Sequence, residues 1–221
     1  MTGRTALLVG ATGLVGGHLL RGLLQDDRYE RIVVLARRAT GVEHPRLDER
    51  VVDFDRLDPA LVKADDVYCA LGTTIKAAGS EDAFRRVDRD YVAAVARAAR
   101  ENGAFQFLLA SSVGAHSGSR AFYTRVKGEA EDAVADLEFP AAHLFRPSVL
   151  IGERAERRPG ERAGLLAARA LRPLLSGPLR KYRAVPARVV ADGMRGAARL
   201  GVRGVYYYEG EAIERAAREV A

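Results

Sequence analysis

Short apolar runs alternate along the chain with segments in which apolar residues recur every three or four positions. The runs are apolar on both faces, as in strands of a parallel sheet that is covered on both sides. They predict strands at Thr5–Gly10, Arg31–Ala36, Arg50–Phe54, Asp66–Ala70, Ala104–Ala110 and Ala142–Arg146. The segments between them predict helices at Gly13–Gln25, Asp90–Glu101 and Tyr123–Leu137, and Ser80 is typical of the N-cap of a further helix.

This alternation predicts an α/β fold, a doubly wound parallel sheet (Rossmann fold) that binds ligands at the carboxyl ends of its strands. The pattern loosens after Arg146. Beyond it we expect an exposed loop at Gly152–Gly164, helices at Leu165–Leu175 and Pro186–Leu200, a last strand at Gly204–Tyr208 and a terminal helix at Glu211–Val220. The 221 residues suit one domain, in which residues 151–221 form a small lid and substrate region.

Glycines recur in the turn between the first predicted strand and the first predicted helix, at Gly10, Gly13 and Gly16. Glycine permits a tight turn and lets the backbone approach phosphate groups, while the N-terminus of the next helix attracts negative charge. Val15 and Leu19 recur four residues apart and begin the apolar stripe of that helix. The motif predicts a site for the pyrophosphate of a dinucleotide, and a ligand-free turn is the alternative.

Composition narrows the class of protein. Hydrophobic residues make up 48% of the chain and charged residues 29%, as in globular proteins, and no apolar run is long enough to span a bilayer. The single cysteine, Cys69, suits a reducing compartment, and the histidines lack metal-ligand spacing. The N-terminus does not resemble a signal peptide. We therefore expect no metal, no membrane insertion and a cytoplasmic location.

The net charge of +6 comes mainly from arginine and is concentrated at one end of the chain. Residues 151–221 hold 15 basic and 8 acidic residues. These arginines are scattered among alanines and acids, without the interleaved aromatic residues of a nucleic-acid surface. A solvated surface is therefore the interpretation we favour, and we expect no nucleic-acid partner.

Tyr123 and Lys127 lie four residues apart in a predicted helix and so share a face. A lysine there can hold a phenolic oxygen and a ribose hydroxyl, and the tyrosine can then act as a general acid or base. Ser111 and Ser112 end the fifth predicted strand, where a hydroxyl would project into the ligand crevice. Together they predict a hydride-transfer site; the alternatives are a surface Tyr–Lys pair and serines that only start a loop or cap a helix.

With these motifs the chain resembles the short-chain dehydrogenase/reductase superfamily, in its atypical or extended branch. The glycines match its G-x-x-G-x-x-G fingerprint, and Ser112, Tyr123 and Lys127 match its catalytic triad. Several segments are similar to the NADPH-binding Tat-interacting-protein-like oxidoreductases and their bacterial relatives: Cys69–Thr74, Val87–Tyr91, Tyr123–Glu129 and Phe145–Glu161.

The resemblance implies how a cofactor would be held. Thr12 to Val15 would lie at the pyrophosphate, Asp53 and Phe54 would flank the adenine, and Leu71 and Gly72 would line the nicotinamide ribose. The complete set implied is Gly10, Thr12, Gly13, Leu14, Val15, Gly16, Arg37, Arg38, Asp53, Phe54, Leu71, Gly72, Thr73, Tyr123, Lys127, Leu150 and Arg158. Core packing is the alternative for Leu71 and Leu150, and a solvated charge is the alternative for Arg158.

The end of the second predicted strand indicates which cofactor binds. It carries Arg37 and Arg38 and no acidic residue that could bind a ribose 2′-hydroxyl. The planar guanidinium of arginine suits a 2′-phosphate, so we expect NADP(H) rather than NAD(H). Two exposed arginines without a ligand are the alternative.

These observations favour an NADP(H)-dependent oxidoreductase that acts on an unidentified carbonyl or alcohol, with a small-molecule substrate as partner. An NADPH-binding regulator without turnover, and an epimerase or dehydratase that uses a transient keto intermediate, remain the alternatives. The region after the sixth predicted strand is short for a nucleotide-sugar pocket. We expect residues 152–162 to close over the cofactor as a lid, and a homodimer is left open.

Overall fold

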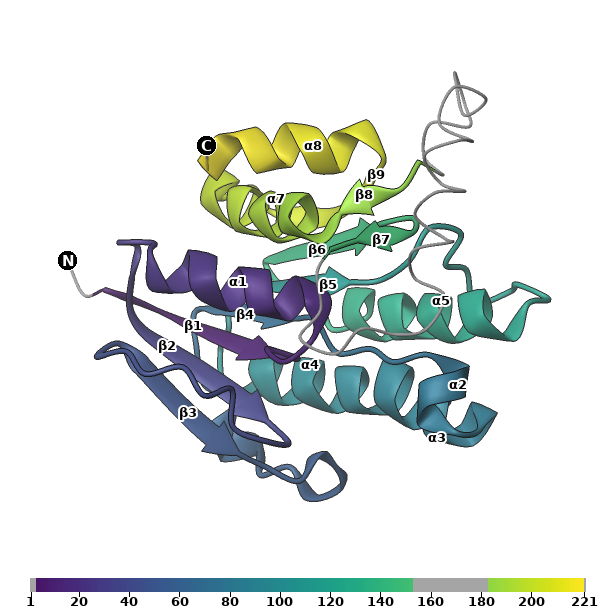
Figure 1. Cartoon of the computed structure of the whole chain (residues 1–221), viewed down its shortest axis with the longest axis horizontal. Coiled ribbons are helices and arrows are strands. Elements are labelled where there is room, and N and C mark those ends of the chain that lie inside the picture. Colours follow the sequence, from purple (N-terminus) through teal and green to yellow (C-terminus); the bar gives the residue numbers. More distant parts are fainter. Residues whose placement is uncertain (1–2, 153–182, 221) are drawn as a thin grey trace.

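The computed structural model describes residues 3–152 and 183–220, and within them a parallel sheet lies between two layers of helices (Figure 1). The seven strands of this sheet follow the order β3-β2-β1-β4-β5-β6-β9, and every neighbouring pair is parallel. Their bounds are Arg4–Val9 (β1), Tyr29–Ala36 (β2), Leu47–Val51 (β3), Asp66–Cys69 (β4), Gln106–Ala110 (β5), Ala141–Arg146 (β6) and Gly204–Glu209 (β9). The α/β class and the doubly wound sheet predicted from the sequence are confirmed.

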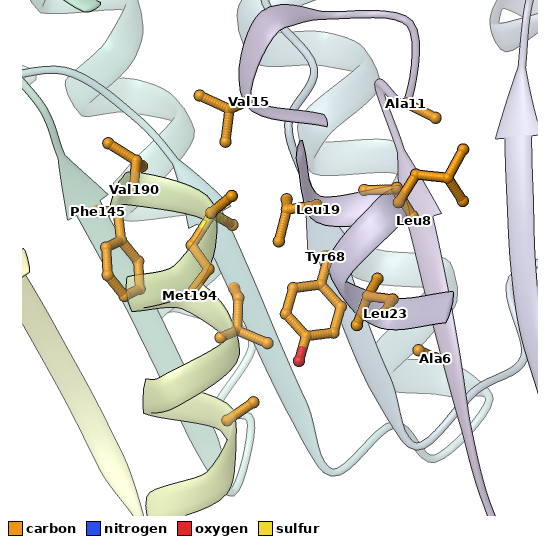
Figure 2. Packing of buried hydrophobic residues seen from close by; sticks show 14 of the residues in the cluster. Ala6, Leu8, Ala11, Val15, Leu19, Leu23, Tyr68, Phe145, Val190 and Met194 are labelled. Atoms are coloured by element: carbon orange, nitrogen blue, oxygen red, sulfur yellow. The ribbon is translucent and has the colours of Figure 1, made fainter. Parts of the chain in front are cut away.

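Helices α1 (Leu14–Leu24) and α7 (Ala187–Leu200) cover one face of the sheet, and α8 (Glu211–Ala217) packs on α7. Figure 2 shows Leu19 and Leu23 of α1 beside Tyr68 of β4 and Met194 of α7. All four side chains are fully buried. The predicted apolar stripe of α1 is therefore the surface that attaches this helix to the sheet.

Helices α4 (Tyr91–Glu101) and α5 (Phe122–Ala135) cover the other face. Leu7 and Val9 of β1 pack in this second core, whereas Ala6 and Leu8 belong to the first. Successive side chains of a strand point to opposite faces, so a strand buried on both faces must be apolar at every position. This requirement explains the continuous apolar runs of the sequence.

The first residues of four strands meet in a buried polar cluster at the amino edge of the sheet, and Asp66 is its centre. The Asp66 carboxylate has no exposed surface and accepts hydrogen bonds from the Tyr29 hydroxyl at 2.6 Å and the Gln106 side chain at 2.8 Å. The Arg4 guanidinium forms an ion pair with the same carboxylate. Asp66 is thus paired and hydrogen-bonded, as a buried charge must be.

Some element boundaries differ from the predictions. Strand β3 ends at Val51, before the predicted end, because Asp53 caps a short 3-10 helix, Phe54–Arg56. Ser80 caps α3 (Glu81–Arg85) as predicted, with its hydroxyl 3.1 Å from the Ala83 N–H. Between α3 and α4 the chain forms a π-helical segment, Arg86–Asp90, that the sequence pattern did not predict.

Further short elements were not predicted. Among them are the helix α2 (Ile75–Ala78), the 3-10 helix Pro59–Leu61, and a pair of two-residue parallel strands, β7 (Leu150–Ile151) and β8 (Val185–Pro186). The predicted loop beyond Gly152 and the predicted helix Leu165–Leu175 lie outside the described residues.

Candidate active site

A cavity of about 780 Å³ lies at the carboxyl ends of β1, β4 and β5. This is the edge at which doubly wound sheets bind ligands, and the volume is within the usual range of small-molecule sites. The wall is made of Ala11–Val15, Gly17, His18, Leu20, Arg21, Arg38–Thr40, Val42, Ala70–Thr74, Asp88, Ala110, Ser111, Tyr123, Lys127 and Pro147–Leu150.

The glycine turn forms part of the wall of this cavity. Gly10 has a φ of +85°, and a Cβ there would lie 2.4 Å from the Ala70 carbonyl oxygen. A Cβ on Gly16 would lie 2.0 Å from the Gly10 carbonyl oxygen, so both positions require glycine. Gly13 is the N-cap of α1 and offers no side-chain cap, which leaves the first N–H groups of the helix free to bind an anion.

The catalytic residues expected from α5 both reach the cavity. Tyr123 is 37% exposed, and its ring packs against that of Phe84 at a centroid distance of 5.4 Å. Lys127, one turn further along, is almost fully buried. The structure therefore brings the Tyr–Lys pair to the same wall as the glycine turn, in agreement with the helical spacing.

Lys127 forms an ion pair that the sequence motif did not indicate. Its Nζ lies 2.8 Å from Oδ1 of Asp88, and Oδ2 of Asp88 accepts a hydrogen bond from the Thr73 N–H at 2.8 Å. Burial alone would lower the pKa of Lys127, but the Asp88 carboxylate and, to a smaller extent, Tyr123 raise this pKa above its ordinary value. The lysine is therefore protonated at neutral pH.

Of the two adjacent serines, Ser111 lines the cavity and Ser112 is absent from its wall. The Ser111 hydroxyl is buried and has no hydrogen-bond partner within residues 3–152 and 183–220. The Ser112 hydroxyl lies 3.5 Å from the Val113 carbonyl oxygen. The structure thus places Ser111 in the wall that also includes Tyr123 and Lys127, and the predicted Ser112 outside this wall. The alternation of side chains along a strand could not distinguish the two serines, because both follow the end of β5.

Two arginines and a histidine also line the cavity. Arg38 lines the wall, whereas Arg37 does not. Arg21 and His18 of α1, which the sequence analysis did not single out, also line it, and an Arg21 nitrogen lies 3.0 Å from Nδ1 of His18. Burial and the charge of Arg21 lower the pKa of His18, so its ring can accept this hydrogen bond.

The remaining predicted residues divide into three groups. Leu71, Gly72, Thr73 and Leu150 line the cavity. Asp53 and Phe54 lie outside its wall: Asp53 accepts a hydrogen bond from the Asp55 N–H, and Phe54 is buried and stacks on Tyr91. Arg158 and the expected lid beyond Gly152 lie outside the described residues.

The described residues were also searched for metal and membrane sites. Within them no group of three or more His, Cys, Asp or Glu side chains is arranged to hold a metal ion. None of the described helices has the length and apolar character needed to cross a membrane.

Comparison with known proteins places the chain among dinucleotide-binding proteins. Residues 10–148 match a protein family described as NAD(P)H-binding. Protein HTATIP2 of Rattus norvegicus is 40% identical over 167 residues, which are 73% of this chain and 69% of the rat protein. The mitochondrial protein FMP52 of Meyerozyma guilliermondii is 37% identical over 153 residues, 67% of this chain and 66% of that protein. The match thus spans about two thirds of the length of these relatives.

Solved structures share the fold. MoeE5 in complex with UDP-glucose and NAD has a TM-score of 0.71 at 17% identity, covering 98% of this chain and 82% of the other. A UDP-N-acetylglucosamine 4-epimerase from Methanobrevibacter ruminantium has a TM-score of 0.73 at 14% identity, covering 95% and 77%. At such identities the likeness shows the fold alone.

The relatives correct one prediction. Six fungal proteins that are 32–37% identical to the chain are named as mitochondrial, which contradicts the cytoplasmic location expected from composition. The location could not be predicted from composition, because a composition that suits one aqueous, reducing compartment suits any other.

Proposed function

Because the chain belongs to the atypical short-chain dehydrogenase/reductase family of NAD(P)H-binding proteins, we propose that it is an NADP(H)-dependent oxidoreductase. The proposed substrate is a small molecule with a carbonyl or alcohol group. One observation carries the proposal: Ser111, Tyr123 and Lys127 line the same cavity as the glycine turn. A protein that only stored or sensed the dinucleotide would need the turn, but not this set of hydrogen-bonding groups beside it.

The residues of the cavity fit the cofactor. The tight glycine turn and the uncapped start of α1 would accommodate a pyrophosphate. The charged Lys127 would hold a ribose hydroxyl, and Leu71 and Gly72 line the same cavity. When bound, the nicotinamide supplies or accepts the hydride.

Two side chains act on the oxygen of the substrate: Tyr123 transfers the proton, and Ser111 polarises the carbonyl group. The hydroxyl of Tyr123 gives a proton to the substrate oxygen during reduction and takes it back during oxidation. The Ser111 hydroxyl, which lacks another partner among the described residues, donates a hydrogen bond to the same oxygen. This division of roles needs no further titratable group at the reacting carbon.

The preference for NADP(H) is supported by two arginines of the cavity wall. Arg38 from the loop after β2 and Arg21 from α1 both line the cavity, and guanidinium groups bind phosphate bidentately. Arginine on two separate elements gives a 2′-phosphate two cationic partners, whereas an unphosphorylated ribose would use neither.

The test is the oxidation of NADPH over a broad panel of aldehydes, ketones and quinones by wild type and by Tyr123→Phe. We expect the variant to lose roughly 100-fold or more in kcat/KM, as for removal of a general acid, while its affinity for NADPH, measured by calorimetry, changes little. Tyr206→Phe is the matched control, because Tyr206 is equally exposed at 37% but lies on β9.

Two results would count against the proposal. Equal rates for wild type and Tyr123→Phe would show that this hydroxyl does not transfer the proton. Tight NADPH binding with no turnover of any member of the panel would instead favour a regulator that senses the dinucleotide.

A further inference from the structure

Asp88 is a buried carboxylate in the cavity wall to which the proposed mechanism gives no task. It lies in the π-helical segment Arg86–Asp90, and its side chain has no exposed surface. The segment continues directly into α4, so it fixes Asp88 on a packed helix rather than on a free loop. Single π-helical turns inside helices are frequent at functional sites.

The Asp88 carboxylate joins two parts of the site that are distant in the sequence. One oxygen accepts the Thr73 N–H of the loop after β4, and the other forms the ion pair with Lys127 of α5, both at 2.8 Å. The backbone of Gly72 lies over this pair, since a Cβ added there would be 3.3 Å from the Asp88 Oδ1 and 3.5 Å from the Lys127 Nζ. The loop, the acid and the lysine therefore form one contiguous unit.

Lys127 depends on a partner for its charge. Its side chain is only 7% exposed, and an unpaired ammonium group at such a depth is strongly disfavoured. The groups that act on it are Asp88, the Tyr123 hydroxyl on its own helix and the Cys69 thiol on β4. Burial raises the pKa of Cys69 to about 12, so the thiol is neutral and Asp88 supplies the balancing charge.

We propose that Asp88 is the buried counter-ion that keeps Lys127 protonated and holds its ammonium group between the Gly72 loop and Tyr123. Asp88 is thus a positioning residue, which acts through Lys127 and does not touch the substrate. Its consequence for catalysis rests on the proposed function, whereas its effect on the charge of Lys127 does not.

The direct test is a pH titration of the lysine side chains, labelled with ¹³C at Cε and followed by NMR in the full chain without cofactor. The chain has four lysines, so the spectrum is simple, and Lys127→Arg identifies the signal of Lys127. In the wild type we expect this signal to stay constant up to about pH 10. In Asp88→Asn its midpoint should fall below the ordinary value for lysine, because the desolvation remains and the counter-ion is gone.

Asp90→Asn is the matched control. Asp90 belongs to the same π-helical segment, but its side chain is 46% exposed and pairs with Arg89 at 2.9 Å, so its loss should leave the Lys127 signal unchanged. A folded Asp88→Asn protein whose Lys127 titrates as in the wild type would overturn the proposal. If the wild type turned over no substrate, the proposed oxidoreductase activity would be rejected. The result of the lysine titration would still decide the role of Asp88.

A double-mutant cycle covers the case in which Asp88→Asn folds but is too unstable for the titration. Lys127→Met removes the buried charge that Asp88 balances, so Asp88→Asn with Lys127→Met should melt at a higher temperature than Asp88→Asn alone. Additive losses of stability would show that the two residues do not act as a pair, and would overturn the proposal by a route independent of activity.

Discussion

Ser111 and Ser112 are adjacent and chemically identical, yet only Ser111 lines the cavity and has a hydroxyl without another partner among the described residues. Ser111→Ala should therefore lower kcat/KM for carbonyl reduction by roughly 100-fold or more, as loss of a preorganised donor does. Ser112→Ala is its control and should change kcat/KM only slightly. The measurement is NADPH oxidation with the best substrate of the panel, and the reverse order of effects would return the role to Ser112.

The arginines allow a second comparison of residues inside and outside the cavity wall. Arg38→Gln and Arg21→Gln should each weaken NADPH binding by roughly tenfold or more, because a hydrogen bond from a charged donor to the 2′-phosphate is lost. Binding of NADH should hardly change. Arg37→Gln is the control, since Arg37 does not line the cavity. Calorimetry with both cofactors decides, and equal losses for NADPH and NADH would place these arginines elsewhere than at the 2′-phosphate.

Local motifs made part of the site predictable at this scale. The glycine turn and the Tyr–Lys pair depend on spacing within one turn or one helix, and the structure places both at the cavity. The Ser111 position, the choice of Arg38 and the Asp88 ion pair depend on where strands end and on which helices meet. Those contacts join residues far apart in the chain, and periodicity carries no information about them.

At the scale of elements, the start of α1 allows a test of the glycine turn with two neighbouring residues. Gly16→Ala would place a Cβ 2.0 Å from the Gly10 carbonyl oxygen, so the turn must open, and stability and NADPH affinity should both fall. At Gly17 the nearest such contact is 3.6 Å, which is ordinary packing. Gly17→Ala should therefore leave stability unchanged or raise it by up to about 1 kcal/mol, as for glycine in a helix interior.

Thermal melting of both variants without cofactor is the measurement. If Gly16→Ala melts as the wild type does, the close approach at the turn is not a constraint on the fold. Because the two glycines are adjacent on one helix, differences in helix propensity cancel in the comparison.

How well each helix or strand could be predicted depends on how strong its pattern of apolar residues is. Helices α1, α4 and α5 began and ended close to their predicted bounds because each has an amphipathic pattern. Strand β3 was misplaced because its residues are only partly buried and lack an apolar run. The π-helical segment has no periodicity of its own in five residues, and so the sequence could not reveal it.

At the scale of the whole molecule, His143 links stability to pH. It is fully buried on β6, with Nδ1 3.0 Å from the Tyr208 hydroxyl, and burial lowers its pKa to about 4. In the unfolded chain the pKa is the ordinary value of about 6.5. Between these two values the unfolded chain binds a proton that the folded protein does not, so the free energy of unfolding falls as pH falls.

We therefore expect stability to be lost as the pH drops from about 6.5 towards 4, by up to roughly 3 kcal/mol from this residue. Chemical denaturation at several pH values measures the loss. His143→Phe keeps an aromatic ring beside Tyr206 and Tyr208 but cannot bind the proton, so its stability should depend less steeply on pH. An unchanged slope would assign the effect to other groups.

The overall topology was the most predictable feature of the chain. Strands buried on both faces and separated by amphipathic helices leave few alternatives to a doubly wound sheet. The pairing of β7 with β8 was not predictable, because it joins two-residue strands whose partners lie 35 positions apart. The cellular location was not predictable either, because composition shows that a protein suits an aqueous, reducing environment but does not show which compartment provides it.

The Asp66 cluster has a consequence for how strands align during folding. Arg4, Tyr29, Asp66 and Gln106 are each the first residue of a strand, so a slip of one strand by a single residue would withdraw its polar group from the shared carboxylate. A buried charge without partners costs more than a correct pair gains. The cluster thus penalises misaligned pairings of the central strands and, by fixing where they begin, sets where their opposite ends stop and the cavity opens.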